Sequence, residues 1–119
     1  MQVVSWNCRG LGNISKVDSV KDLLKIAPAD ILLLQETKIE KEALLLLSKS
    51  KWSLKSGKVV SARGTFGGLA TLWSDNNFQL NRWHVTQHWI YTDLFHISND
   101  ISVSLFNLYV PVNFMEKKC

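Results

Sequence analysis

The sequence predicts a domain of the mixed α/β (α+β) class, a mixed sheet with flanking helices, on three observations. Residues 31–34 form an uninterrupted apolar run, which is typical of a strand buried on both faces. Val17, Val20 and Leu24 recur at helical spacing, which indicates a helix that buries one face. From Val59 onward, runs of β-branched and aromatic residues are separated by turn sequences, which indicates strands that follow one another directly.

Two strands of the first half each end in a polar residue. A short β-prone run over residues 3–6 leads into Asn7 and then into two turn glycines. The buried strand over residues 31–34 is followed closely by Glu36. Both strands therefore deliver a polar side chain at their carboxyl ends.

Two helices are predicted beside these strands. The first is expected to begin at Ser15, because Asp18 three residues later gives a pattern that resembles a capping box, and to end before Pro28. The second is favoured by helix propensity over residues 40–48, and a polar connector follows over residues 49–58.

The second half of the sequence resembles an antiparallel meander. Its strands are predicted over residues 59–60, 69–73, 80–85, 89–97 and 101–110. Alternate residues of the last strand share one face, so its apolar stripe becomes polar at Asn107 and Tyr109, just before Pro111. This pattern predicts a buried face that turns into part of a functional site.

Composition narrows the class of protein. Hydrophobic residues make up 46% and charged residues 20% of the 119 residues, which is typical of one globular domain or part of one. No apolar run is long enough to cross a bilayer, and the first residues lack the features of a signal peptide. Cys8 and Cys119 are far apart and form no zinc or disulfide pattern. We therefore expect an intracellular protein, nuclear or cytoplasmic, that is neither secreted nor bound to a membrane.

Positive charge is concentrated between Lys41 and Arg63, where six basic residues occur with one acidic residue. Such a segment could follow a phosphate backbone, although lysines that only solubilise a helix and a loop are the more common explanation. Candidate nucleic-acid contacts, each weakly indicated, are Arg9, Lys38, Lys55, Lys58 and Arg63.

If the strand ends converge, Asn7, Glu36, Asn107 and Tyr109 would place one carboxylate, two amides and a phenol around one point. Magnesium prefers oxygen ligands and is often held by one or two carboxylates together with substrate phosphates. Amide and phenol groups can hydrogen-bond phosphate oxygens without adding negative charge. The candidate site is therefore one for a metal ion and a phosphate.

Each of these features also has an ordinary explanation. A Glu after an apolar strand is more often a surface residue, and an Asn near Gly is more often a turn former. The pair Gly67-Gly68 could admit a ligand to the backbone, but a turn or bulge is more common. His84 and His88 share a predicted strand face and could bind a metal, although solvent-facing or core-edge histidines are more common. The five tryptophans could stack bases, although packing is the more common role.

Four sequence blocks also resemble those of a known family, both in their amino-acid sequence and in their order along the chain. They are Ser5-Trp6-Asn7-Cys8-Arg9-Gly10-Leu11-Gly12, Asp30-Ile31-Leu32-Leu33-Leu34-Gln35-Glu36-Thr37-Lys38, Gly67-Gly68-Leu69 through Leu72-Trp73, and Asn107-Leu108-Tyr109-Val110-Pro111. Together they resemble the endonuclease/exonuclease/phosphatase superfamily, which includes abasic-site endonucleases, deoxyribonuclease I and the endonuclease domains of LINE-type retrotransposons. The first block looks most like the plant retrotransposon branch.

The resemblance implies a fold and a set of roles. The family fold is a four-layer α/β sandwich of the deoxyribonuclease I-like type, and this chain would supply the first sheet with its helices. Glu36 matches the metal-binding carboxylate, and Asn7 matches an Asn beside the metal and the scissile phosphate. Asn107 and Tyr109 fall on the Asn-x-Tyr-x-Pro block, whose Tyr contacts phosphate or supports the site. The implied cofactor is Mg²⁺, with Mn²⁺ as an alternative, and the implied partner is DNA.

The chain departs from the family pattern after Pro111. The family's Gly-Asp-Phe-Asn block, its later Asp and its Ser-Asp-His block, which carries the catalytic His, have no counterpart before Cys119. Residues 1–119 are therefore expected to be the N-terminal half of the domain, and the missing half to supply the opposing sheet. Such a half would expose an apolar sheet face and could self-associate.

The expected function is that of a truncated, metal-dependent phosphodiesterase, ancestrally a DNA-nicking endonuclease of a retrotransposon and inactive as it stands. One alternative is a segment of an active hydrolase of RNA or small phosphate esters. Another is a nucleic-acid-binding remnant without catalysis. A small-molecule ligand is not expected.

Overall fold

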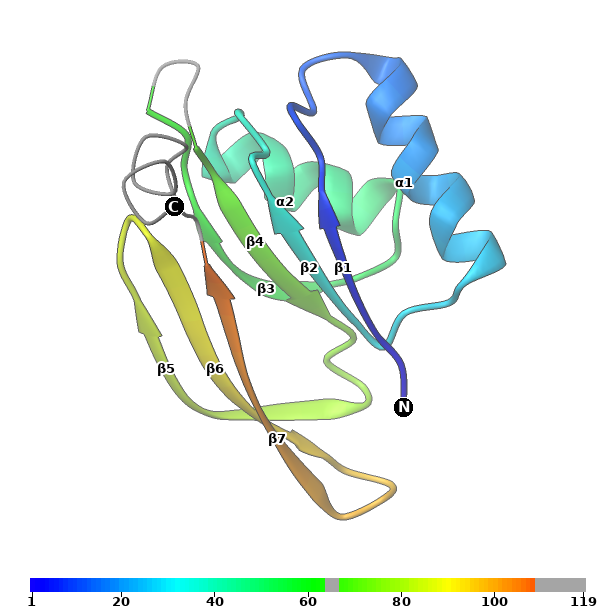
Figure 1. The fold of residues 1–119 in the computed structure, drawn as a ribbon. Helices are drawn as coiled ribbons and strands as arrows, with labels where there is room; N and C mark the ends of the chain where they lie inside the picture. Colours follow the sequence, from blue (N-terminus) through cyan, green and yellow to red (C-terminus); the bar gives the residue numbers. More distant parts are fainter. Residues whose placement is uncertain (64–66, 109–119) are drawn as a thin grey trace, which may run out of the picture.

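The computed structural model describes residues 1–63 and 67–108 (Figure 1). Along these ranges the chain forms β1 (Val3–Asn7), α1 (Ile14–Ile26), β2 (Ile31–Gln35), α2 (Lys41–Ser50), β3 (Ser56–Val60), β4 (Leu69–Trp73), β5 (Phe78–Val85), β6 (Trp89–His96) and β7 (Ile101–Leu108). The predicted mixed class is confirmed, because helices alternate with strands up to β3 and only strands follow.

The first sheet has the strand order β1-β2-β4-β3. β1 and β2 are parallel, and the other neighbours are antiparallel. Both helices lie on one face of this sheet (Figure 1). Val20 of α1 and Leu44 of α2 are fully buried there, in one apolar cluster with Leu32, Leu34 and Leu72 of the two central strands. The helices hold their place because each presents an apolar stripe to a buried sheet face.

The second sheet is an antiparallel meander in the order β5-β6-β7. It packs on the face of the first sheet that the helices leave open, so helices, first sheet and second sheet form three layers (Figure 1). A second apolar cluster fills this interface, formed by Ile31, Leu33, Trp73, Phe78 and Leu94. Alternate residues of β6 face this cluster and are buried, as the two-residue period of a strand requires.

The position of the meander corrects the expectation that this chain supplies one sheet only. The turn formed by residues 74–77 separates β4 from β5, and β5 pairs with β6 instead of joining the first sheet. Part of the opposing sheet is therefore already present. The physical reason is the second apolar face of the continuous run in β2, which needs a covering layer of its own.

The helix starts also differ from the sequence prediction in one detail. The side chain of Asn13, and not that of Ser15, caps α1, with Oδ1 accepting a hydrogen bond from Lys16 N at 2.9 Å. Glu40 precedes α2 and makes no capping hydrogen bond with its side chain. In the part of the chain that the structure describes, no helix is long and apolar enough to cross a membrane.

Candidate functional site

The carboxyl ends of β1 and β2 lie side by side, because the two strands are parallel and in register, with Asn7 opposite Gln35. The loops that leave these strands stay together. Three main-chain hydrogen bonds join them: Cys8 N to Gln35 O (2.9 Å), Gly10 N to Glu36 O (2.7 Å) and Leu11 N to Thr37 O (2.8 Å). Asn7 and Glu36 are therefore brought to the same edge of the sheet, as the sequence predicts.

The backbone at this edge is strained. Arg9, Glu36 and Lys38 adopt positive φ angles of 54°, 53° and 57°, which side-chain-bearing residues seldom do. Among the described residues, three of the five non-glycine positive φ angles fall in this loop pair. Such strain persists only where the surroundings enforce it, and it is often found at functional sites.

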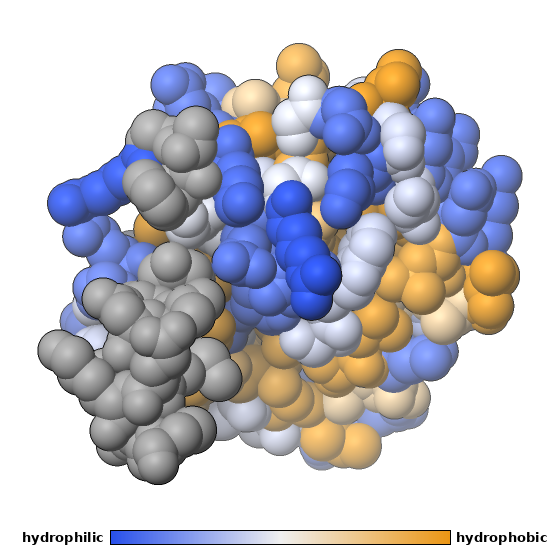
Figure 2. Space-filling view, turned by 45° about the horizontal axis from the view of Figure 1, so that its top comes forward, coloured by the Kyte–Doolittle hydropathy of each residue, from blue (hydrophilic) through white to orange (hydrophobic). Residues whose placement is uncertain are grey.

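The side chains of this edge combine one carboxylate with cations and an amide. Glu36 is half-buried, whereas Asn7, Arg9 and Lys38 are exposed. Asn7 Oδ1 accepts a hydrogen bond from Arg9 N at 3.1 Å, which fixes the amide and turns its NH₂ group into the available donor. Figure 2 looks obliquely onto this end of the molecule, where hydrophilic side chains gather over the edge beside an apolar surface.

Cys8 and Lys16 lie directly beneath this edge. Lys16 Nζ donates a hydrogen bond to Cys8 O at 3.2 Å, so a third cation lies beside the loop that leaves β1. Burial raises the pKa of Cys8 to about 12; the positive charge of Lys16 opposes this shift and the negative charge of Glu36 adds to it. Cys8 is therefore a neutral thiol at physiological pH. Lys16 was missed as a site residue, because its position in the first turn of a helix gives no such signal.

The Asn107 side chain is not at the surface of this edge. It is 1% exposed and lies behind the edge, between the two sheets. Its Nδ2 donates to Ala70 O at 2.9 Å and to Leu34 O at 3.2 Å. Its Oδ1 accepts from Gln35 Nε2 at 2.9 Å, and the same Gln35 amide donates to Ser5 Oγ at 3.0 Å. Asn107 therefore fastens the second sheet to the end of β2, one residue before Glu36. Gln35 belongs to this network and was missed as a site residue.

The glycine pair also serves the loop that carries Glu36. Gly67 O accepts from Lys38 N at 2.9 Å, and Gly68 O accepts from Thr37 N at 3.2 Å. Both glycines have positive φ, and a Cβ on Gly68 would collide with the Thr37 side chain. The close approach made possible by Gly68 is therefore to the protein's own backbone, and the turn explanation applies.

The three histidines occupy three different places in the fold. The sequence suggested that His84 and His88 share a strand face. This is wrong, because β5 ends at Val85 and His88 lies in the following turn. His84 Nδ1 accepts from Trp89 Nε1 at 3.2 Å. His96 is buried at the opposite end of β6. Tyr109, the remaining predicted site residue, lies outside the described residues.

A metal ion at this edge would depend on few protein ligands. Within residues 1–63 and 67–108, no group of three or more His, Cys, Asp or Glu side chains is placed to hold a metal. Glu36 supplies one carboxylate and Asn7 one amide, both of them hard oxygen donors. This donor set fits Mg²⁺, which keeps several waters and needs only one or two carboxylates, and it does not fit zinc.

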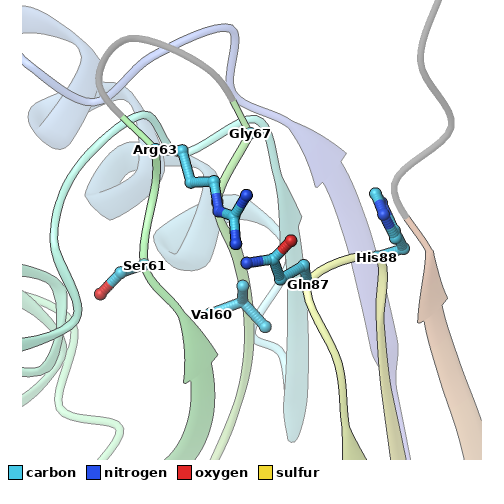
Figure 3. A pocket seen from close by; sticks show the side chains of 7 residues that line it. Val60, Ser61, Arg63, Gly67, Gln87 and His88 are labelled. Carbon is cyan, nitrogen blue, oxygen red and sulfur yellow. The ribbon is translucent and has the colours of Figure 1, made fainter.

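A small hollow of about 90 Å³ adjoins the glycine pair. It is lined by Val60, Ser61, Arg63, Gly67, Gly68, Gln87 and His88. The side chains of Arg63 and Gln87 point toward one another across it (Figure 3). Of the predicted nucleic-acid contacts, Arg9, Lys38 and Arg63 therefore lie at the Glu36 end of the molecule. Lys55 and Lys58 lie toward the other end of β3, beside Trp73 at the end of β4.

Solved structures with a similar fold include an AP endonuclease and a 3′-5′ exonuclease. The catalytic domain of APE2 from Xenopus laevis matches 93% of this chain and 45% of its own length, with a TM-score of 0.63 and 20% identity. The 3′-5′ exonuclease NExo from Neisseria meningitidis matches 99% of this chain and 47% of its own, with a TM-score of 0.63 and 21% identity. The AP endonuclease LMAP from Leishmania major matches 90% and 39%, with a TM-score of 0.60 and 17% identity.

These likenesses confirm the expected deoxyribonuclease I-like fold class, and the chain spans less than half the length of each of the three structures. No curated protein matches the chain by sequence. The model of one protein family, in contrast, matches residues 4–112, which is most of the chain. The chain therefore belongs to the Endonuclease/Exonuclease/phosphatase family.

Proposed function

We propose that this chain is the metal- and phosphate-positioning part of a divalent-metal-dependent phosphodiesterase whose substrate is DNA. The observation that carries the proposal is the loop pair after β1 and β2, where Asn7 and Glu36 meet on a strained and tightly hydrogen-bonded backbone. The amino-acid sequence of residues 5–12 supports descent from a retrotransposon endonuclease. We propose that residues 1–119 correspond to the first half of such an endonuclease domain.

The roles follow from the chemistry of each side chain. The Glu36 carboxylate holds the metal, Mg²⁺ or Mn²⁺, and the second lone pair of the Asn7 amide oxygen can complete the protein ligands. The Asn7 NH₂ group and the cations of Arg9 and Lys38 bind phosphate oxygens. A bound divalent ion would stabilise negative charge on the phosphate and make a bound water more acidic.

The sequence blocks that carry the family's proton-abstracting His have no counterpart in residues 1–119. Hydrolysis of a phosphodiester uses a general base within hydrogen-bonding reach of the attacking water. His84 is bonded to Trp89, and His96 is buried at the far end of β6. We therefore propose that this chain binds metal and DNA without useful turnover. Tyr109 and Asn107 remain proposals as site residues, with Asn107 acting from behind the site.

The proposal is tested by metal binding and by nicking, measured separately. Mn²⁺ binding, followed by electron paramagnetic resonance, should be lost in Glu36→Gln and retained in Glu42→Gln, an exposed glutamate of α2. Supercoiled plasmid with Mg²⁺ should stay intact with this chain and be nicked once a family C-terminal half is fused to it. Unchanged Mn²⁺ binding by Glu36→Gln would refute the metal assignment. Nicking by the chain alone would refute only the proposed inactivity.

A further inference from the structure

A seam runs along one side of the molecule, where β3 and β5 lie near each other. Each is the outermost strand of its sheet within the described residues. An open groove of about 460 Å³ occupies the lower end of this seam, at the start of both strands. Lys49, Lys55 and Lys58 line it from the side of α2 and β3, and Leu80 lines it from β5. Among its lining residues, Asp75 carries the one negative charge.

In the middle of the seam, the Lys58 side chain packs over the ring of Trp83. Lys58 Nζ lies 3.8 Å from the centre of the Trp83 ring, which is a cation–π contact between β3 and β5. Trp83 is 54% exposed, so a large part of the ring stays accessible. This contact fixes the direction of both side chains, and it places a positive charge and an aromatic surface at one point of the seam.

The upper end of the seam is the hollow between Arg63 and Gln87 (Figure 3). Its floor includes Gly67 and Gly68, whose carbonyl groups hold the loop that follows Glu36. The seam is therefore continuous with the edge where the site lies. The five residues of β3 span about 17 Å, the length of about five stacked nucleotides at about 3.4 Å each.

We propose that this seam binds a single strand of nucleic acid. Lys55, Lys58 and Arg63 place positive charges before, within and after β3, in the order in which a phosphate backbone would pass them. The exposed ring of Trp83 beside them offers a stacking surface, which unpaired bases can reach and the stacked bases of a duplex cannot. A strand that leaves the Glu36 edge can enter the upper end of the seam and run down toward Lys55.

This inference goes beyond the proposed phosphodiesterase function, because strand binding in the seam needs neither Glu36 nor a metal ion. It also divides the candidate nucleic-acid contacts into two groups. Arg9 and Lys38 belong to the Glu36 edge, and the lysines of β3 and its neighbours belong to the seam.

The seam is tested by the binding of a fluorescein-labelled 12-nucleotide thymidine strand, measured by fluorescence anisotropy in EDTA. The double variant Lys55→Gln/Lys58→Gln is compared with Lys21→Gln/Lys25→Gln, which removes two exposed lysines of α1 on the other side of the first sheet. The seam variant should bind on the order of tenfold more weakly, with a salt slope smaller by about 0.7 for each lost phosphate contact. The α1 variant should bind like the unaltered chain.

The aromatic part is tested with Trp83→Ala and Trp83→Phe. Alanine should weaken binding of the strand, and phenylalanine should restore much of it because it keeps a ring for stacking. Circular dichroism melting curves confirm that each variant is folded. Equal affinities of the seam and α1 double variants for the strand would overturn the proposal. Because the assay contains EDTA, no metal held by Glu36 contributes to the binding, which separates this test from that of the proposed function.

Discussion

The residue that best connects the fold to the site is Asn107. Its amide spans the gap between the sheets and uses both its donor and its acceptor groups on β2 and β4. A buried amide is tolerated only when it is hydrogen-bonded, and here its partners include Leu34 O and the Gln35 side chain. The end of β2, and with it Glu36, is thereby tied to β7.

Substitution of Asn107 should therefore lower the free energy of unfolding. Asn107→Ala leaves Leu34 O, Ala70 O and the Gln35 amide without this partner, at a cost of about 1–3 kcal/mol. Asn107→Asp should cost more at neutral pH, because a carboxylate oxygen would face two carbonyl oxygens in a buried position.

Urea denaturation followed by circular dichroism measures both losses. The buried carboxyl of the Asp variant is expected to have a raised pKa, so its penalty should shrink as pH falls and the group becomes protonated. Ser104→Ala, an exposed position on the same strand, is the control and should change stability by less than about 0.5 kcal/mol. An Asp variant as stable as this control would show that the amide does not act as a link between the sheets.

At the scale of elements, the loop after β2 and the turn before β4 act as one unit. Gly67 and Gly68 accept hydrogen bonds from Lys38 and Thr37, so the two segments continue the pairing of β2 with β4 beyond the strands. This pairing helps to hold Glu36 at its positive φ angle, because the residues that follow Glu36 cannot relax independently.

The two glycines form a matched pair for a test. Gly67→Ala changes a residue with a φ of 73° and open space around the added Cβ, so the left-handed conformation alone should cost about 1 kcal/mol. Gly68→Ala adds a collision with Thr37 and a contact of 3.0 Å with Lys38 N, so its loss should be larger by about 2 kcal/mol. Thermal unfolding and Mn²⁺ titration of both variants measure this. Equal losses of stability in the two variants would mean that the loop after β2 moves to accommodate the added methyl group and that the close approach at Gly68 does not hold the site.

The sequence predicted these elements where a local pattern determines them. The uninterrupted apolar run of β2 and the β-branched and aromatic residues of β6 are patterns of this kind, and both strands were predicted within one residue of their bounds. The cap of α1 was placed at Ser15 because Asp18 three residues later resembles a capping box, whereas Asn13 is the residue whose extended backbone and side chain cap the helix.

The site was predictable in part for the same reason. Asn7 and Glu36 end parallel neighbouring strands, so their proximity follows from topology. The inward role of Asn107 depends on where the second sheet lies against β2 and β4, which no local pattern encodes. The seam between β3 and β5 likewise arises from the packing of two sheets, so the grouping of Lys58 with Trp83 could not be foreseen.

At the scale of the whole molecule, the layers are unequally covered. Helices cover the outer face of the first sheet (Figure 1), whereas the outer side of the second sheet carries exposed apolar residues. Phe106 and Leu108 of β7 are 60% and 53% exposed, and the Phe106 ring lies 4.8 Å from that of Tyr91 on β6. Neighbouring exposed apolar side chains of this kind often mark a contact with another protein surface.

We therefore expect this chain to self-associate through β7 as its concentration rises. The double variant Phe106→Ser/Leu108→Ser should sediment as a monomer at concentrations where the unaltered chain forms larger species, because it removes the apolar area that association would bury. Ile26→Ser is the control, since Ile26 is even more exposed, at 84%, but lies at the end of α1 on the other side of the molecule. Sedimentation velocity distinguishes the three proteins. If Ile26→Ser dissociates the chain as well as the β7 variant does, association follows from general hydrophobicity and the outer face of the second sheet is not its cause.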